Sequence, residues 1–217
     1  MAAPAGSQPN RLERRKARTR AALIGAAQSF LADGRPDAPI LDITRAADVG
    51  LGSFYNHFTD REQLFHAAVV SALDGLGATF DVLTGELDDP AEVFARSFRL
   101  LGRLHRREPI LSKVLLNNWA TTPIVDEKGL VPRVRRDLAA GVAAGRFAVG
   151  DIELTLALIT GAAICLGRLL HDDPDRDDAD SVDRMTEDLL RTLGLPAADA
   201  RELSRRPLPP PDISLPG

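Results

Sequence analysis

Residues 40–58 hold two helical patterns that are each too short to be stable alone. Ile40, Ile43 and Ala47 recur at helical spacing, the pattern breaks at residues 48–50, and a second pattern covers residues 51–58. Because isolated helices of this length are marginal in water, the second helix must pack on the first and on the helix that precedes both. The spacing therefore predicts a helix-turn-helix built on a core of three helices.

The rest of the chain is also predicted to be helical, and no segment alternates convincingly as a strand. A first helix is expected over residues 14–32, ending before Gly34, which suits a left-handed cap. A capping box from Thr59 to Glu62 opens a helix to about residue 80, and Asp89 before Pro90 opens another. Further helices are expected at residues 110–120, 132–144, 152–170, 179–193 and 197–205. The expected fold class is all-α.

Charge is distributed unevenly along the chain. The net charge is −4, yet residues 1–70 carry 9 basic and 7 acidic residues. Residues 11–20 alone hold six basic residues against one acid, Glu13. A basic arm on an otherwise acidic protein can attach to phosphate while the remaining surface is repelled by it. The distribution therefore favours a nucleic-acid contact near the N-terminal end.

Several features bear on the compartment. Cys165 is the only cysteine, which excludes an intrachain disulfide and favours a reducing, cytoplasmic location. We interpret it as an inert core thiol. No secretory signal is expected, because residues 1–10 lack an apolar core. The longest apolar stretch, residues 152–170, includes Glu153 and Arg168 and is at the short limit for a membrane span, so we expect a buried helix and no membrane association.

The second short helix of the helix-turn-helix has two distinct faces. Its inward residues, with those of the preceding helix, are expected to be Ile43, Ala47, Val49, Phe54 and Phe58. Its outward residues are expected to be Leu51, Gly52, Ser53, Tyr55, Asn56 and His57. The outward set is rich in hydrogen-bonding groups and contains no acid. It suits a helix in a DNA major groove, where Ser and Asn meet base edges while Tyr and His meet phosphates.

These residues resemble the TetR-family DNA-binding signature over residues 18–66. The signature reads Ala-Gly-Val, Gly-Thr, an apolar residue, Tyr, His or Tyr before Phe, and Lys-Glu before Leu. The matching positions are Ala47-Asp48-Val49, Gly52-Ser53, Phe54, Tyr55, His57-Phe58, Arg61-Glu62 and Leu64. Asp48 replaces the turn glycine but tolerates the left-handed conformation, and Arg61 keeps the charge of the usual Lys. Pro39 follows Ala38 where a Thr or Ser usually caps the second helix.

The resemblance implies a role for each matched position. Leu51, Gly52 and Ser53 approach bases, Tyr55 and His57 contact phosphates, and Arg61 anchors the following helix on phosphate. Arg45 and Asn56 are further DNA-binding candidates. A basic arm before the first helix is expected to follow phosphate or enter the minor groove, and its residues are Arg11, Arg14, Arg15, Lys16, Arg18 and Arg20.

The resemblance also implies a C-terminal helical ligand-binding domain whose last two long helices form a homodimer. Residues 152–170 are apolar nearly all round, and Gly161 with its neighbours permits close helix approach. The stripe expected to pair with it across a two-fold axis is Val182, Met185, Leu189, Leu190 and Leu193. A dimer would present two reading heads to a pseudo-palindromic operator. The expected organisation is a disordered basic arm (1–13), the helix-turn-helix (14–66), the regulatory domain (67–206) and a Pro-rich tail (207–217).

A pocket for a small-molecule effector is expected between the middle helices. Apolar candidates are Phe94, Phe98, Leu101, Leu115, Trp119, Phe147 and Ile159, and polar candidates are His105, Asn118, Thr122 and Thr160. Plain core packing is nevertheless the favoured interpretation for Phe94, Phe98 and Trp119, and a surface position is the favoured interpretation for His105. Because most pockets are apolar, we expect an apolar or amphipathic effector, whose binding changes the separation of the two reading heads.

Motifs of catalysis are missing from the sequence. It contains no phosphate loop, no Gly-x-Ser-x-Gly and no His-Glu-x-x-His, and one Cys with four His supplies a metal or nucleophile site poorly. We therefore expect no enzymatic activity, no metal and no cofactor. The leading interpretation is a repressor that a small molecule releases from its operator. The alternatives are a DNA-binding regulator without a small-molecule effector and, less favoured, an all-helical enzyme.

Overall fold

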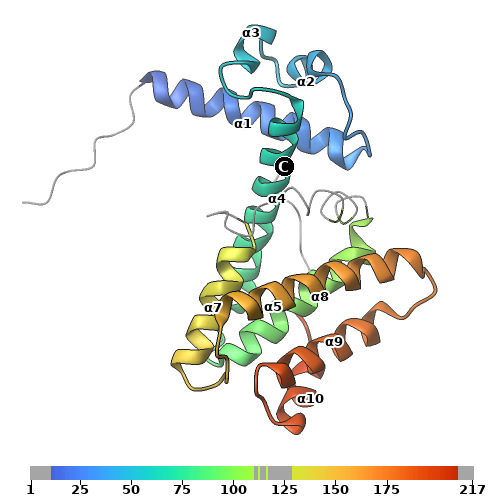
Figure 1. Cartoon of the computed structure of the whole chain (residues 1–217). Coiled ribbons are helices and arrows are strands. Elements are labelled where there is room, and N and C mark those ends of the chain that lie inside the picture. Colours follow the sequence, from blue (N-terminus) through green and yellow to red (C-terminus); the bar gives the residue numbers. More distant parts are fainter. Residues whose placement is uncertain (1–10, 110–111, 113–115, 117–128, 210–217) are drawn as a thin grey trace, which may run out of the picture. The chain divides into compact units, whose positions relative to one another are not determined.

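The computed structural model describes residues 11–109, 112, 116 and 129–209, and within them the chain is helical, with no strand (Figure 1). The chain is divided into two compact units, Met1–Ala68 and Val69–Gly217. The first contains α1 (Arg11–Ala32), α2 (Ile40–Ala46), α3 (Leu51–Phe54) and the start of α4 (Arg61–Thr84). The second contains the rest of α4 with α5 (Pro90–Arg107), α7 (Val131–Ala143), α8 (Ile152–Asp172), α9 (Asp178–Thr192) and α10 (Ala197–Arg205). The predicted all-α class is confirmed.

The core of the first unit is built as the helix-turn-helix pattern predicts. Leu23 of α1, Ile43 of α2, Phe54 of α3 and Leu64 of α4 are fully buried. The rings of Phe54 and Phe58 lie 5.9 Å apart between centroids, and the guanidinium of Arg20 lies 5.1 Å from the centre of the Phe58 ring. A helix of four residues is therefore held by its one buried aromatic side chain, because it has too few backbone hydrogen bonds to be stable alone.

The start of α1 differs from the expectation. The helix begins at Arg11 rather than at residue 14, so the basic residues expected in an arm lie on the helix itself. Arg, Lys, Leu and Ala all favour the helical state, and Glu13 in the first turn complements the helix dipole. Residues 1–10 of the expected disordered arm lie outside the described residues, as does tail segment 210–217.

Two aspartates set the local geometry on either side of α3: Asp48 in the turn before it, and Asp60 at the start of α4. Asp48 adopts the left-handed conformation with φ of 53°, as predicted for the position where the family signature has glycine. The capping box begins one residue later than predicted: Asp60 Oδ1 accepts from the Gln63 amide at 2.7 Å, and Gln63 Oε1 accepts from the Thr59 amide at 2.7 Å. The Glu62 side chain takes no part in it, because Asp60 rather than Thr59 is the cap and α4 begins at Arg61.

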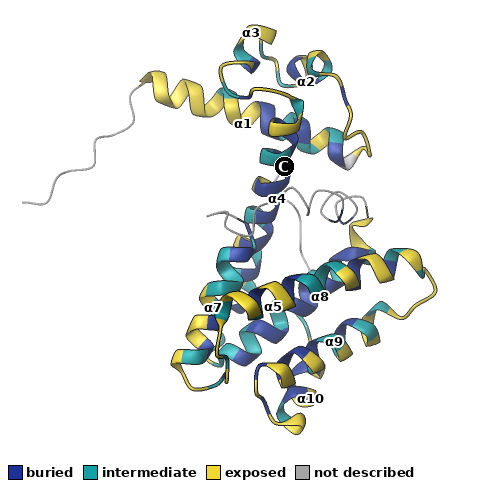
Figure 2. Ribbon diagram, viewed as in Figure 1, coloured by how far each residue is buried: buried dark blue, intermediate teal, exposed yellow. Residues whose placement is uncertain are grey.

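In the second unit, α5 packs against α7, α8 and α9, and α10 packs on α9 (Figure 2). The α5–α9 approach is close because Gly102 faces Val182: a Cβ on Gly102 would lie 2.5 Å from a Val182 methyl. The apolar stripe of α9 therefore lies inside the protomer, with Val182, Leu190 and Leu193 essentially inaccessible. The expectation that this stripe pairs across a two-fold axis is wrong, since its partners are α5 and α10 of the same chain.

Helix α8 is buried on only one side. Leu156, Ile159 and Leu166 face the core, whereas Leu154 is 70% exposed and Leu158 is 48% exposed. Cys165 is also exposed, so its interpretation as a core thiol is corrected. By length and composition alone α4 and α8 could each cross a membrane, a test that core helices of soluble proteins also pass. The outer face of α8 is thus an apolar surface without a partner among the described residues.

Candidate nucleic-acid interface and ligand pocket

The outward residues of the first unit lie around α3, as the sequence predicts. Leu51, Gly52, Tyr55 and Asn56 are exposed, and Ser53 and His57 are half-buried. Tyr55 is 59% exposed, and its ring stands edge-on against buried Phe54 with centroids 5.2 Å apart. The helix itself ends at Phe54, and residues 55–57 continue as a turn in which the His57 amide donates to the Phe54 carbonyl at 2.9 Å. Phe54 thus anchors a short polar surface on the core.

Two further predicted residues flank this surface. Arg45 is exposed on α2. Arg61 is half-buried at the start of α4, where Nη1 donates to the Asp37 carbonyl oxygen at 2.7 Å. Arg61 therefore ties α4 to the loop before α2. Pro39 begins α2 without a side-chain capping bond, as expected from the missing Thr or Ser.

A cleft of about 600 Å³ separates the first turns of α1 from the α2–α3 turn and α3. On one side it is lined by Leu12, Arg15, Lys16 and Thr19, and on the other by Asp48, Val49, Gly50, Ser53, Asn56 and His57. Partial burial lowers the pKa of His57, and the charges of Arg20 and Lys16 lower it further. The surface around α3 is therefore electropositive, apart from Asp48 on its rim.

The second unit contains a cavity of about 90 Å³ among α4, α5, α7 and α8. Four predicted apolar residues, Phe94, Phe98, Leu101 and Ile159, line it, as does the polar candidate Thr160. The rings of Phe94 and Phe98 stack at 6.1 Å with 23° between their planes. Phe147 is not among the lining residues; it is buried against Phe94 and over Gly141. The candidates Leu115, Trp119, Thr122 and Asn118 lie outside the described residues.

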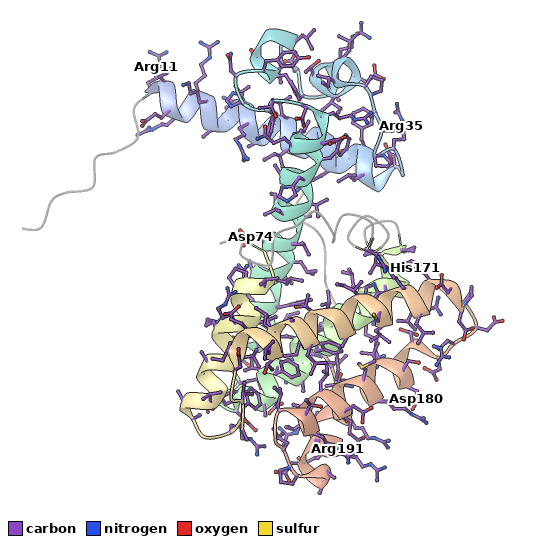
Figure 3. All side chains as sticks on the ribbon, viewed as in Figure 1. Arg11, Arg35, Asp74, His171, Asp180 and Arg191 are labelled. Atoms are coloured by element: carbon purple, nitrogen blue, oxygen red, sulfur yellow. The ribbon has the colours of Figure 1, made fainter. Side chains whose placement is uncertain are left out.

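One end of this cavity is polar, and the sequence analysis did not find it. Asp81 of α4 and Arg133 and Asp137 of α7 line that end. Arg133 bridges two acids about two turns apart on α4. Its Nε lies 2.8 Å from Asp81 Oδ2, and its Nη1 lies 2.7 Å from Oδ1 of Asp74, which Figure 3 labels. Burial raises the pKa of Asp137, although its carboxylate pairs with Arg136 at 2.8 Å. For Asp81, burial also acts to raise the pKa, but hydrogen bonds from Arg133 and Arg136 outweigh it and lower the value.

Comparison with known families supports the expected family. The profile described as "Bacterial regulatory proteins, tetR family" matches residues 23–68, and the profile described as "Tetracyclin repressor-like, C-terminal domain" matches residues 89–206. The second match alone covers more than half of the chain. The chain belongs to the TetR family. No curated protein matches it.

Solved structures agree with membership of the TetR family. RolR in complex with resorcinol is 34% identical, with 91% of this chain and 98% of the RolR chain covered and a TM-score of 0.69. A putative TetR-family regulator from Shewanella sp. PV-4 is 16% identical, with 82% and 99% covered and a TM-score of 0.62. FadR from Bacillus subtilis with stearoyl-CoA is also 16% identical, with 80% and 96% covered and a TM-score of 0.55, and like the Shewanella protein it shows the fold alone.

The function that sequence reasoning predicted is therefore confirmed at the level of the family. The protein is a DNA-binding transcription regulator with a helix-turn-helix in its N-terminal unit. TetR-family regulators bind operator DNA, act as dimers and respond to small molecules, and the family and its structural neighbours are transcription regulators rather than enzymes.

The second unit of this TetR-family regulator also contains a His–Ser–His cluster, in which His105 and Ser112 are buried and His171 is half-buried. His105 of α5 is only 5% exposed, which corrects the expectation of a surface position. Its Nδ1 lies 2.6 Å from Ser112 Oγ. Ser112 Oγ in turn lies 2.8 Å from Nε2 of His171, which Figure 3 labels at the end of α8. The ring fits because residue 167 of α8 is glycine, where a Cβ would lie 2.4 Å from His105 Cε1. Arg103 and Arg106 cover this side of α5 by donating to the carbonyl oxygens of residues 178 and 173.

The stability of the regulator is expected to fall between about pH 6.5 and pH 4 because of His105. Burial, followed by the charge of His171, lowers the pKa of His105 from 6.5 to about 4. In that window the unfolded chain binds a proton that the folded protein does not, so stabilisation present above pH 6.5 is lost as the pH falls. A shift of this size corresponds to about 3 kcal/mol.

The measurement is urea unfolding of wild type and His105→Gln at fixed protein concentration across this range. Gln keeps a hydrogen-bonding side chain but does not titrate. Because carboxylates titrate equally in both proteins, the variant's stability should fall less steeply than that of wild type. Parallel pH profiles would contradict a neutral, buried His105.

Proposed function

We propose that this chain is a homodimeric, cytoplasmic repressor of a pseudo-palindromic operator, released when a small hydroxylated aromatic molecule occupies the cavity of the second unit. The observation that carries the proposal is the cavity itself, which combines stacked aromatic side chains with an Asp–Arg–Asp end. The alternative hypothesis, a DNA-binding regulator without a small-molecule effector, gives this cavity no role.

Recognition of the operator is assigned to α3 and the turn after it. Leu51, Gly52 and Ser53 are proposed to approach base edges, and Asn56 beside them adds amide donors and acceptors. Tyr55, His57 and Arg45 are assigned to phosphates, which fix the register of the helix on the duplex. Arg61 keeps N–H groups beyond the one given to the Asp37 carbonyl, so it can both order the loop and contact phosphate.

Dimerisation is assigned to the outer face of α8. Leu154, Leu158, Cys165 and Leu169 recur at spacings of four and seven residues and are all exposed in the protomer. Gly161 lies within this stripe and meets no atom where its Cβ would be, so a second helix can approach closely there. A symmetric contact between two copies of α8 covers this face and sets two reading heads for two half-sites.

The dimensions of the cavity favour a single aromatic ring. An apolar cavity of about 150 Å³ holds benzene. The cavity between Phe94 and Ile159 measures about 90 Å³, so even a single ring must widen it on binding and a larger effector would have to widen it further. RolR, the 34% identical structure, was solved with resorcinol, a benzene ring with two hydroxyl groups. At the polar end, the Asp137 carboxylate can accept from a ring hydroxyl and Arg133 can donate to one. We therefore propose resorcinol-like phenols as the effector class.

The same polar end provides a route from effector to DNA. Arg133 joins α7 to α4 through Asp74 and Asp81, and α4 is one helix from Arg61 to Thr84. A hydroxyl that binds Arg133 or Asp137 competes with these ion pairs and changes how α7 holds α4. Helix α4 begins at Arg61, which holds the loop before α2 through the Asp37 carbonyl. A change in α4 therefore alters the affinity for DNA. The coupling free energy in typical allosteric proteins is about 1–3 kcal/mol.

Variants of α3 test the assignment of the recognition surface. Tyr55→Ala is expected to weaken binding about tenfold for every duplex sequence, because it removes a phosphate contact. Ser53→Ala is expected to change the ratio between operator and base-substituted operator about tenfold, because it removes a contact to a base edge. Fluorescence anisotropy with labelled duplexes measures both. Tyr55→Phe removes the hydroxyl but keeps the ring against Phe54, so it separates the two roles: it should bind as weakly as Tyr55→Ala if the hydroxyl contacts phosphate. Normal DNA binding by Tyr55→Ala would mean that α3 is not the recognition helix.

A further inference from the structure

Helix α4 contains a buried glycine, Gly77, at a position where a good helix former would be expected. Gly77 lies well inside α4, where glycine is less favourable than alanine. Its backbone is ordinary, because Gly77 does not belong to the glycines with positive φ. Conformational freedom therefore does not explain this glycine, and its reason must lie in a close contact.

The close contact is with the side chain of Arg133 of α7. A Cβ on Gly77 would lie 2.7 Å from Arg133 Cδ, 2.7 Å from Nε and 2.8 Å from Cζ. Real Cβ atoms do not approach other atoms so closely, so the two groups could not keep these positions. The guanidinium end of Arg133 thus lies directly on the backbone of α4, with no room for a methyl group between them.

Two carboxylates hold the guanidinium in this position. Asp74, which Figure 3 labels, lies three residues before Gly77, and Asp81 lies four residues after it, so all three share one face of α4. Arg133 Nη1 donates to Asp74 Oδ1 at 2.7 Å and to the Gly129 carbonyl oxygen at 2.6 Å, and Nε donates to Asp81 Oδ2 at 2.8 Å. Burial acts to lower the pKa of Arg133, but the hydrogen bonds to the two aspartates outweigh it and raise the pKa. The guanidinium therefore cannot make room for a side chain at position 77 without loss of these bonds.

We propose that Gly77 is a positioning residue for the link between effector and DNA: it lets Arg133 lie across α4 between the two aspartates, and so holds α7 against α4 in the state that binds the operator. This rests on the proposed function, in which an effector hydroxyl competes with the same ion pairs. A methyl group at position 77 lifts the guanidinium off α4 and breaks these pairs without any effector. The variant protein then resembles the released state.

The first test compares stabilities by urea unfolding at fixed protein concentration. Gly77→Ala should lower the urea midpoint of wild type, because the lost ion pairs outweigh the better helix propensity of alanine. In an Arg133→Ala background the same substitution should raise the midpoint, since the clashing atoms are gone and only the gain in helix propensity remains. Gly25→Ala in α1 is the matched control, because a Cβ there meets no neighbouring side chain within 4 Å, and it should raise the midpoint in both backgrounds. A Gly77→Ala midpoint that rises in wild type as well would overturn the proposal.

The second test measures operator affinity by fluorescence anisotropy without effector. Gly77→Ala and Arg133→Ala should each bind the operator about tenfold more weakly than wild type. The double variant should bind no more weakly than Arg133→Ala alone, because both substitutions remove the same contact. Wild-type affinity for Gly77→Ala, or losses that multiply in the double variant, would overturn the proposal. If wild type preferred no duplex sequence, the proposed function would fail instead, and the unfolding comparison would still decide whether Gly77 positions Arg133.

Discussion

Leu158→Glu is expected to convert the protein to a monomer and to weaken its binding to a two-half-site operator at least about 100-fold. Leu158 is 48% exposed on the outer face of α8, between exposed Leu154 and Cys165. In a symmetric contact the residue meets its own copy or a near neighbour, so Glu would place like charges in an apolar interface. Loss of the dimer removes the second reading head, and linkage of two binding events contributes about 10²–10⁴ in affinity.

Sedimentation velocity at micromolar concentration measures the oligomeric state, and anisotropy measures DNA binding. Val82→Glu is the matched control, since Val82 is 78% exposed on α4 and does not belong to the α8 face. It should remain a dimer and bind DNA as wild type does. A dimeric Leu158→Glu protein with normal affinity would show that the two-fold contact lies elsewhere.

Ala163→Leu is expected to yield a repressor that binds its operator but no longer responds to resorcinol. Ala163 of α8 lines the cavity of about 90 Å³, and Leu adds three carbon atoms directed into that space. Apolar atoms in an existing cavity gain contacts instead of overpacking, so the fold should be retained. Affinity for resorcinol should fall at least about 100-fold, because the ring and the new side chain exclude each other.

Calorimetric titration with resorcinol and release of labelled operator measure the two effects. Ala179→Leu is the control, because residue 179 is exposed on α9 and far in sequence from the cavity residues. If the Ala163→Leu protein released its operator at the same resorcinol concentration as wild type, the effector would bind elsewhere. If wild type bound no resorcinol and kept its operator, the proposed effector class would be wrong, while DNA binding would be unaffected.

The fold was largely predictable because apolar spacing and end signals agreed along the chain. Asp89, Asp151 and Gly194 mark helix ends where the sequence predicts them, and α10 has the predicted bounds. The start of α4 differed because Thr59 and Asp60 are both good caps, and only the geometry shows that Asp60 bonds to the Gln63 amide. A single sequence cannot rank two adjacent capping residues whose stabilising effects are similar.

The sites were only partly predictable, for a related reason. The exposure of the residues around α3 was predictable because they are contiguous, so the pattern that builds α3 also shows which side chains point outward. The polar end of the cavity was missed because Asp81 and Arg133 are 52 residues apart and resemble ordinary surface charges in the sequence. The α9 stripe was misassigned because amphipathic periodicity shows that a face is buried but not against which partner.

The central claim is that this chain is a sequence-specific, dimeric DNA-binding regulator. Selection of binding sites from a random duplex pool with the full-length protein, at near-physiological salt, tests it most directly. The account predicts enrichment of one pseudo-palindromic motif with two half-sites, and resorcinol should then release that duplex. Recovery of duplexes without any shared motif, bound with an affinity that depends only on salt, would contradict it.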